Sequence, residues 1–501
     1  MKKSLFTLCF AVLCATGNTQ PYIDSFDINT PGVYKSSNPA NLFGYGNSLY
    51  FMATDSTHGA ELWSMDANST FPTRLTDIMP GTKNSLMYGL NTIGVLNSII
   101  YYTANDSSHG AELWFYYPGG GTGMIKDIRD GVLGSFPNYL LPYDNRLYFA
   151  ATDAHGNELW MHEPASGKTE RLTDINIDSL SSYIREPIAF NGKIYFQAMT
   201  QASGPELYVY NPTDGSTQMV ADIRPGNIGS NPLKFHVMGN KLYFIANDAT
   251  TGYELYAYDG NSAPLRLTDL GSGPSPGIYQ TANMEDLNGI LYFCGYDSLG
   301  NGFQLFKYDP ASNSTSLVHT INPSTSAYIN HITRYGNAIF FSANDATHGP
   351  ELWKYDGINT PSIVIDLYPG STGSFINAIT NCGLHLYFAA RNVTYGLELF
   401  RYSNFPAGVE NISRLSGAFV YPNPTKDIAH LEIDLKQNET LEILLTDMQG
   451  RTVYRSNKVL YSAAKYIIDI PVQNQPAGNY MYSLYSSING NLVASGKLVK
   501  E

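Results

Sequence analysis

Short apolar runs separated by polar, glycine-containing turns recur along most of this chain. The most regular is a tripeptide of Leu or Ile followed by two aromatic residues. It occurs eight times, at 49–51, 100–102, 147–149, 194–196, 242–244, 291–293, 339–341 and 386–388. About ten residues later comes a second apolar run, ELW in its first copy. It opens on Glu61, Glu112, Glu158, Glu206, Glu254, Gln304, Glu351 and Glu398. These positions lie 46 to 51 residues apart, so the chain contains eight copies of a repeat of about 48 residues.

Each repeat is long enough for four short strands. One precedes the Gly/Asn turn, two are the apolar runs, and a fourth follows the ELW run, as in RLTDI at 74–78. The aromatic runs do not alternate with polar residues, which is typical of strands buried on both faces. A propeller blade between two neighbouring blades provides that environment. The pattern therefore predicts an all-β fold with an eight-bladed β-propeller over residues 22–405, whereas an open solenoid would need polar end caps.

The two ends of the repeat region are complementary. The eighth repeat lacks a clear fourth strand, and an unassigned strand pattern, IDSFDI, occurs at 23–28. We expect this N-terminal strand to complete the last blade, because a closed ring leaves no open sheet edge. The alternative is that NISRL at 411–415 supplies the missing strand.

The repeat pattern stops after Gly408, and residues 406–417 are interpreted as a linker. Residues 418–501 contain short alternating runs at 430–435, 441–447, 451–456, 465–471, 480–486 and 492–500, with Gly or Pro in several of the turns. This pattern predicts a small antiparallel, Ig-like β-sandwich.

Four motifs in this last segment carry a family resemblance: YPNP at 421–424, DMQGR at 447–451, PAGNYMY at 476–482 and GKLVK at 496–500. Together they resemble the type IX secretion C-terminal sorting domain, type A. The resemblance implies periplasmic transit in a Gram-negative cell, recognition by an outer-membrane translocon, and then surface attachment or release. The residues that it implicates are Tyr421, Pro422, Asn423, Pro424, Gly478, Tyr480, Gly496, Lys497, Leu498, Val499 and Lys500. More loosely, the repeats resemble the ELW-type repeats (ELWxxDGT) of secreted bacterial proteins, a family that points to no particular activity.

The N-terminus agrees with export. Residues 1–17 have a basic start, an apolar run and small residues after it, which predicts a cleaved signal peptide. The run is too short to span a bilayer, and we expect no transmembrane segment elsewhere. Lipidation at Cys14 is the alternative. The remaining cysteines, Cys294 and Cys382, fall in different repeats and are expected to be unpaired.

Net charge narrows the list of partners. The chain has a formal net charge of −13, and removal of Lys2 and Lys3 with the signal peptide would leave a net charge of −15. Nucleic-acid binding relies on clustered basic residues that neutralise phosphates, so it is not expected.

The stretch ATDSTHGAELW at 53–63 combines residue types used in catalysis and metal binding. In other copies, however, the His is replaced by Ser203 or Thr251. The Asp is replaced by Thr200 or Asn392, and the Glu is replaced by Gln304. We therefore interpret these residues as a structural hairpin loop, with metal binding and catalysis as alternatives. The loop residues expected to be structural are Asp55, Gly59, Glu61, Asp106, Gly110, Glu112, Asp345, Gly349 and Glu351.

No catalytic, cofactor or metal motif is recognised. GPSPG at 273–277 matches a nucleophile-elbow pattern only formally, since no helix pattern follows it. We expect a secreted or surface-displayed module that binds a glycan or a protein, or serves as a passive adhesin. The alternative is a hydrolase or lyase acting on polysaccharide or peptide at the channel mouth, which carboxylates confined to one or two blades would favour. Ligand contacts should lie in non-recurring segments such as 181–190 and 229–238.

Overall fold

The computed structural model describes residues 21–29, 35–67, 69–86, 92–177, 180–394, 396–406, 419–435, 438–447, 451–462, 464–486 and 492–501. Within these ranges the chain is all-β, with no helix. It divides into two compact units, Asp24–Arg401 and the remainder. Among the described residues, no helix is long and apolar enough to cross a membrane.

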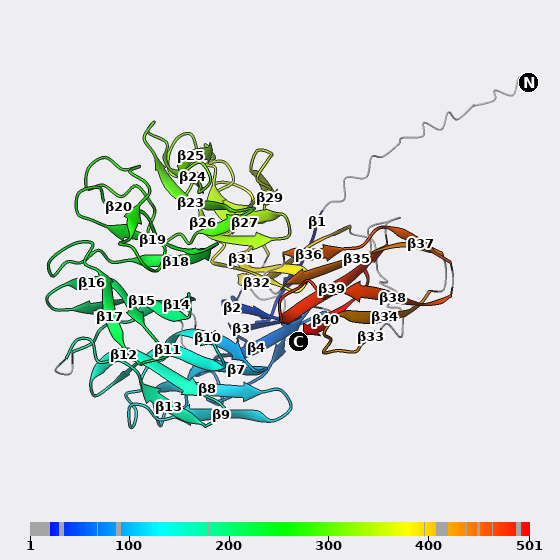
Figure 1. Ribbon diagram of the computed structural model, residues 1–501, viewed down its shortest axis with the longest axis horizontal. Coiled ribbons are helices and arrows are strands. Elements are labelled where there is room, and N and C mark those ends of the chain that lie inside the picture. Colours follow the sequence, from blue (N-terminus) through cyan, green and yellow to red (C-terminus); the bar gives the residue numbers. More distant parts are fainter. Residues whose placement is uncertain are drawn as a thin grey trace, which may run out of the picture. The chain divides into compact units, whose positions relative to one another are not determined.

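Eight four-stranded antiparallel sheets follow one another around the first unit (Figure 1). Sheets 1 and 2 are β2 (Ala40–Tyr45), β3 (Ser48–Thr54), β4 (Ala60–Asp66), β5 (Thr73–Arg74) and β6 (Ile93–Leu96), β7 (Ile99–Asn105), β8 (Ala111–Tyr117), β9 (Gly121–Lys126). Sheets 3 and 4 are β10 (Asn138–Tyr143), β11 (Arg146–Asp153), β12 (Gly156–Glu163), β13 (Lys168–Arg171) and β14 (Arg185–Phe190), β15 (Lys193–Thr200), β16 (Gly204–Tyr210), β17 (Thr217–Ala221).

The second half of the ring repeats this order. Sheets 5 and 6 are β18 (Leu233–Met238), β19 (Lys241–Asn247), β20 (Tyr253–Tyr258), β21 (Leu265–Arg266) and β22 (Glu285–Leu287), β23 (Ile290–Asp297), β24 (Gly302–Asp309), β25 (Ser314–His319). Sheet 7 is β26 (Asn330–Tyr335), β27 (Ala338–Asn344), β28 (Pro350–Tyr355) and β29 (Ser362–Ile365). Sheet 8 has β30 (Ala378–Cys382), β31 (His385–Arg391) and β32 (Leu397–Pro406), followed in the pairing order by β1 (Pro21–Phe26).

The first strand of each sheet lies on the inside of the ring. These inner strands contact one another in sequence, from β2 to β6, β10, β14 and β18, and from β22 to β26, β30 and back to β2. A contact between His236 and Asp286 joins β18 to β22. The arrangement is propeller-like, as the repeat pattern indicated.

Burial explains why the aromatic runs do not alternate. On β3, Leu49 and Phe51 are fully buried, and so is Met52, which points to the opposite face. Hydrophobic clusters link neighbouring sheets: one of them joins Leu207 of sheet 4 to Phe244 of sheet 5. Each large side chain buried in this way contributes about 1.5 to 3 kcal/mol, so packing between sheets is the main source of stability.

The N-terminal strand pairs with the last strand of the repeat region, giving the order β1-β32-β31-β30. An ion pair supports this pairing, because Arg401 Nε lies 2.8 Å from the Asp24 carboxylate, 377 positions earlier in the sequence. The predicted signal peptide at 1–17, the linker from residue 407 on and the alternative strand at 411–415 lie outside the described residues.

The C-terminal segment forms two antiparallel sheets around a hydrophobic core of its own. One sheet contains β33 (Phe419–Tyr421), β34 (Ile428–Asp434) and β38 (Lys465–Pro471). The other contains β36 (Thr452–Arg455), β35 (Glu439–Asp447), β39 (Gly478–Ser486) and β40 (Leu492–Lys500), with β37 (Val459–Tyr461) also paired to β35. The six predicted runs all form strands. The short strands β33 and β37 were not predicted, because three residues are too few to show an alternating pattern.

The cysteine prediction is confirmed. Cys294 and Cys382 are both free and buried.

Candidate functional site

The hairpin loops that carry Asp, His and Gly are held by local hydrogen bonds. Asp55 Oδ1 accepts the backbone N–H groups of Thr57 and His58, at 2.8 and 2.7 Å. Asp345 accepts those of Thr347 and His348 in the same way, at 2.9 and 2.8 Å. Burial acts to raise the pKa of Asp345, but the hydrogen bonds from His348 and Thr347 outweigh it and hold the pKa below its usual range. These are the contacts expected of a turn-forming Asp.

Asp106 accepts the same kind of hydrogen bonds, and the glycines of these loops occupy positions that suit glycine. Asp106 Oδ1 accepts the N–H groups of Ser108 and His109, each at 2.9 Å. Gly110 and Gly349 have left-handed backbones, with φ of 68° and 70°. At Gly59 the backbone approach is close instead, since an added Cβ would lie 2.0 Å from the carbonyl oxygen of Lys83. Each of these loops therefore has a conformation or contact that favours glycine.

The glutamate of each ELW run is fully buried and holds the connection to the next sheet. Glu112 accepts the N–H groups of Ile128 and Ser135, at 3.2 and 2.8 Å. Glu351 likewise accepts the Leu367 N–H at 3.2 Å and the Ser374 hydroxyl at 2.7 Å. Burial raises the pKa of Glu351 to about 7, although these hydrogen bonds oppose the shift. Glu61 is bonded to the Thr76 hydroxyl at 2.6 Å.

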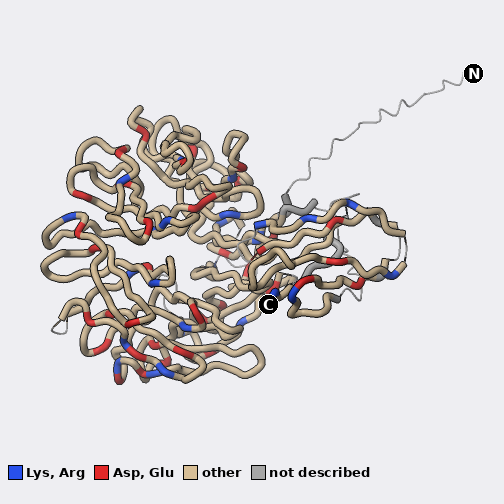
Figure 2. Tube along the Cα trace, viewed as in Figure 1, with Lys and Arg blue, Asp and Glu red and all other residues tan. Residues whose placement is uncertain are grey.

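Ionisable residues of the inner strands are confined to one half of the ring. Four consecutive strands, β14, β18, β22 and β26, each contain two. The other four, β2, β6, β10 and β30, contain no Asp, Glu, Lys, Arg or His. We call the eight residues the charged arc: Arg185, Glu186, Lys234, His236, Glu285, Asp286, His331 and Arg334. Elsewhere in the unit both signs of charge are interspersed (Figure 2).

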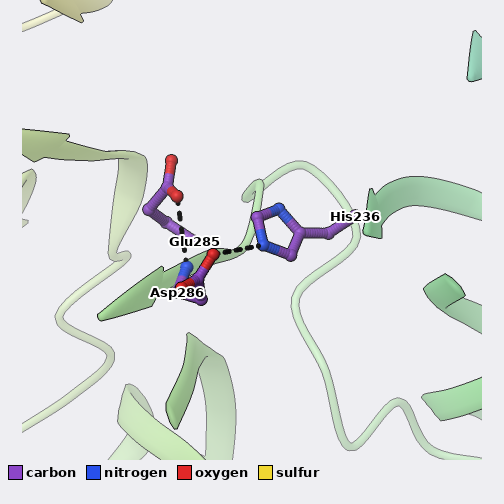
Figure 3. Close-up of side chains that lie close together, drawn as sticks. All are labelled: His236, Glu285 and Asp286. Atoms are coloured by element: carbon purple, nitrogen blue, oxygen red, sulfur yellow. Dashed lines mark hydrogen bonds and ion pairs between the residues drawn. The ribbon is translucent and has the colours of Figure 1, made fainter. Parts of the chain in front are cut away.

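The centre of the charged arc is a contact between β18 and β22. Figure 3 shows the His236 ring directed toward the Asp286 carboxylate, with Nε2 and Oδ1 3.1 Å apart. Arg334 Nη1 lies 3.7 Å from the other carboxylate oxygen of Asp286, Oδ2. Glu285 accepts the Asp286 N–H at 3.2 Å. Burial raises the pKa of Glu285; the His236 side chain opposes the shift and the Asp286 carboxylate adds to it.

His236, Glu285 and Asp286 also form a candidate metal-ligand set. One ligand atom from each lies within 4.8 Å of the others. A nitrogen and two carboxylate oxygens are suitable donors for a divalent transition metal. However, the neighbouring Arg334 already supplies a cation to Asp286, so charge neutrality here does not require a metal.

The other end of the charged arc is also ion-paired. Lys234 Nζ lies 3.7 Å from Glu186, and the Lys234 backbone N–H donates to the same carboxylate at 2.5 Å. Burial, together with the positive charge of Lys234, lowers the pKa of His331 to about 4. At neutral pH, His331 is therefore an uncharged member of the arc.

A cavity of about 270 Å³ lies beside the charged arc, between sheets 4 and 5. It is lined by Tyr183, Arg185, Gln197, Met199, Pro205 and Asn231. The Tyr183 side chain is 56% exposed, whereas Gln197 is buried and donates through Nε2 to Asn231 Oδ1. Asn231 in turn donates to the Tyr253 hydroxyl at 2.7 Å. The cavity thus combines an aromatic ring, a guanidinium and two amides.

Sequence reasoning named no residue of the charged arc, because each looks ordinary within its own repeat. Their signal appears only when the strands before the eight Gly/Asn turns are aligned and compared for charge. The segments 181–190 and 229–238, singled out as non-recurring, do contribute Tyr183, Arg185 and Asn231 to the cavity.

The sorting motifs converge in the C-terminal unit. Asn423 Oδ1 accepts the Val499 N–H at 2.8 Å, which joins the YPNP segment to β40. On the neighbouring strand, Gly478 pairs with Lys500 and Tyr480 with Leu498. Further along the same ladder, Lys497 pairs with Met481 and Gly496 with Tyr482. Pro422 and Pro424 each follow a cis peptide bond, after Tyr421 and Asn423.

Residues 419–501 match the family described as the secretion system C-terminal sorting domain. The match confirms the resemblance found in the sequence and implies interaction with type IX secretion machinery. The protein is therefore secreted, and is displayed on the cell surface or released outside the cell.

Several solved structures are similar to this chain. A puromycin-hydrolyzing peptidase of Mycobacterium tuberculosis has a TM-score of 0.46 and 11% identity, over 73% of this chain and 62% of that one. PorZ, an essential bacterial surface component of the type-IX secretion system of Porphyromonas gingivalis, has a TM-score of 0.32 and 13% identity, over 92% of this chain and 75% of PorZ. The β-propeller domain of the Trilobed protease from Pyrococcus furiosus has a TM-score of 0.39 and 11% identity, over 68% of this chain and 99% of that domain.

At these values the comparisons carry no inference about activity. The chain spans only about three fifths of the peptidase, 62% of its length. No curated protein matches the sequence.

Proposed function

We propose that this protein is a surface-displayed or released glycan-binding protein. Its eight sheets are the blades of one closed eight-bladed propeller over residues 22–405, completed by the N-terminal strand, and its tail is an Ig-like sandwich at 418–501. Residues 1–17 are a signal peptide removed in the periplasm. The glycan binds at the charged arc and the adjoining cavity, and the hairpin loops with Asp55, Asp106 and Asp345 are structural.

The observation that carries the proposal is the asymmetry of the inner strands. A ring of repeats needs equivalent residues at equivalent positions for its own stability, as the eight buried Glu or Gln side chains illustrate. The charged arc departs from that pattern in four consecutive sheets and is absent from the other four. Four of the eight sheets form without ionisable groups on their inner strands, so the ring does not require them, and their concentration on one side points to a ligand site.

The cavity favours a glycan over a folded protein as the ligand. Its volume suits one ring-sized group, and it offers hydrogen-bonding amides beside an exposed aromatic ring. A protein partner would instead need a broad surface of about 800 Å² on each side.

Binding of the full-length protein to a broad glycan array tests the proposal. We expect binding to at least one glycan class, weakened by Tyr183→Ala. The matched control is Phe136→Ala, which removes an exposed aromatic side chain at the equivalent position before the uncharged inner strand β10. The absence of binding to every glycan of the array would contradict the proposal.

One observation favours a second candidate function, hydrolysis or elimination of a polysaccharide. Glu285 is half-buried and its pKa is raised, while the adjacent Asp286 is paired with His236 and Arg334. A carboxyl group with a raised pKa beside a carboxylate that is paired with cations suits general acid–base catalysis. This candidate predicts released sugars from a polysaccharide panel and their loss in Glu285→Gln. No product from any polysaccharide would exclude it and leave the binding function standing.

A further inference from the structure

Resting on the proposed function, we infer that the glycan is acidic and that Arg185 binds the carboxylate of a uronic acid in the cavity between sheets 4 and 5. Tyr183 packs against a face of the sugar ring, and Gln197 and Asn231 hydrogen-bond its hydroxyl groups. Four features of the cavity support this assignment.

The first feature is that Arg185 is charged, whereas the equivalent residues in four other sheets are not. Arg185 lies opposite Gln197 in the sheet ladder. The equivalent pairs are Ala40 with Met52, Asn138 with Ala150, Leu233 with Ile245 and Asn330 with Ser342. None of these carries a charge, and none pairs a cation with an amide. The stability of a sheet therefore does not require an Arg and a Gln at this position.

The second feature is the free guanidinium. Within the described ranges, the Arg185 side chain forms no hydrogen bond or ion pair, whereas Lys234 and Arg334 of the charged arc each lie near a carboxylate. The guanidinium is exposed and has no carboxylate partner among the described residues, so it is available to a ligand. The planar guanidinium matches a carboxylate through two parallel hydrogen bonds, which makes an acid group its natural ligand.

The third feature is the aromatic ring. Tyr183 is 56% exposed and its backbone is left-handed, with φ of 48°. Phe136, Tyr328 and Phe375 occupy the equivalent position before the inner strands of sheets 3, 7 and 8, with φ of 48° to 51°, so an exposed aromatic ring here is common in the repeat. What distinguishes Tyr183 is that it lines one cavity together with Arg185. An exposed aromatic face packs against the apolar face of a planar or ring-shaped ligand.

The fourth feature is the pair of amides. Gln197 and Asn231 are bonded to each other, and Asn231 also donates to Tyr253, so their orientation is fixed before a ligand arrives. Amides provide both donors and acceptors, as neighbouring sugar hydroxyls do. The carboxylate of a peptide C-terminus could bind the guanidinium, but a peptide would form fewer contacts with the two amides and with the face of the aromatic ring.

Titration of the full-length protein with four probes tests the inference. Two probes are a uronic-acid trisaccharide and its methyl ester. The other two are the same tripeptide with a free C-terminus and with an amidated C-terminus. We expect the acidic trisaccharide to bind at least about tenfold more tightly than its ester, because charge-assisted hydrogen bonds are lost on esterification. Binding of the acidic form should also weaken as salt is raised.

Variants then assign the effect to the cavity. Arg185→Gln should weaken binding of the acidic trisaccharide by about tenfold or more and leave the ester unchanged. Arg185→Lys should recover part of the loss, because it restores the charge but not the planar pair of donors. Tyr183→Ala should weaken both ligands. The controls Lys193→Gln, at the start of β15 in the same sheet, and Phe136→Ala, before the uncharged strand β10, should change neither.

Equal affinity for the acid and the ester, or an unchanged affinity in Arg185→Gln, would overturn the inference while glycan binding itself stood. Tight binding of the free-acid peptide in place of the trisaccharide would assign the cavity to a peptide terminus and overturn it as well. If neither trisaccharide binds and the protein also binds no glycan of the array, the proposed function fails together with the inference.

Discussion

The Glu398 carboxylate accepts the backbone N–H of Ser37 at 2.9 Å, a contact between residues 361 positions apart. The same side chain also accepts the Ile28 N–H at 3.3 Å and the Ser37 hydroxyl. Ile28 follows β1 and Ser37 precedes β2. One buried side chain of the last sheet therefore holds the chain segment between the closing strand and the first sheet.

Removal of this carboxylate should destabilise the protein strongly. Glu398→Ala leaves three donors without their acceptor, so we expect the free energy of unfolding to fall by about 3 kcal/mol or more. Glu398→Gln should cost much less, because sheet 6 has Gln304 at the same position and its Oε1 accepts the Ile321 N–H at 2.9 Å. Guanidinium unfolding of both variants measures the difference. Equal losses in the two would contradict this role for the carboxylate.

The buried glutamates should make stability depend on pH. Burial raises the pKa of both Glu351 and Glu398 to about 7, from an ordinary value of 4.5. Their stabilising contribution is thus fully present below about pH 4.5 and is lost as the pH rises to about 7, because the folded state retains protons that the unfolded chain releases.

A double Gln variant isolates this effect from other titrating groups. The free energy of unfolding of Glu351→Gln/Glu398→Gln, relative to the natural protein, should increase between pH 4.5 and 7. The order of magnitude is 2 to 3 kcal/mol for each group. A difference that stays constant over this interval would show that the two pKa values are not raised.

The His of the hairpin loops should be dispensable, although its Asp is not. In sheet 5, Asp248 accepts the N–H groups of Thr250 and Thr251, each at 2.9 Å, with Thr251 in place of the His. His348→Thr should therefore change stability by less than about 0.5 kcal/mol and leave ligand binding intact. Asp345→Ala should cost about 1 to 2 kcal/mol, because two backbone donors lose their acceptor. Thermal unfolding checks both, and a large loss of binding in His348→Thr would revive a functional role for the loop.

The last strand should be required for export. Asn423 and Thr425 both bond to Val499 of β40, and β40 forms the edge of its sheet. We expect a chain truncated after residue 491 to be absent from the cell surface and the medium, as detected by protease treatment of intact cells and by analysis of the culture supernatant. Lys465→Gln on β38 should be exported normally. Normal export of the truncated chain would contradict the assignment of the sorting function to these motifs.

The repetitive part of this fold could be predicted from the sequence, because equivalent strands of the repeats are buried in the same way. Leu49 and Phe51 are fully buried, and the equivalents on β19, Leu242 and Phe244, are fully buried too. The substitutions in other copies led to the interpretation of the recurring Glu and Asp as structural, and the structure adds which donors they bind.

The charged arc could not be predicted by the same reasoning, because its residues belong to different repeats and meet only through ring geometry. His236 and Asp286 are 50 positions apart, and nothing in either local segment indicates the other. Arg185 shows the same limit: its distinctiveness is clear only beside the uncharged residues at the equivalent positions.

The most direct test of the central claim, that ligand recognition lies on one half of the inner strands, is an experimental structure of the protein bound to the tightest glycan from the array. We predict that the glycan contacts Tyr183 and Arg185 and lies along β14, β18, β22 and β26. A glycan seated on the uncharged inner strands β2, β6, β10 and β30, or on the outer strands of the sheets, would contradict the claim.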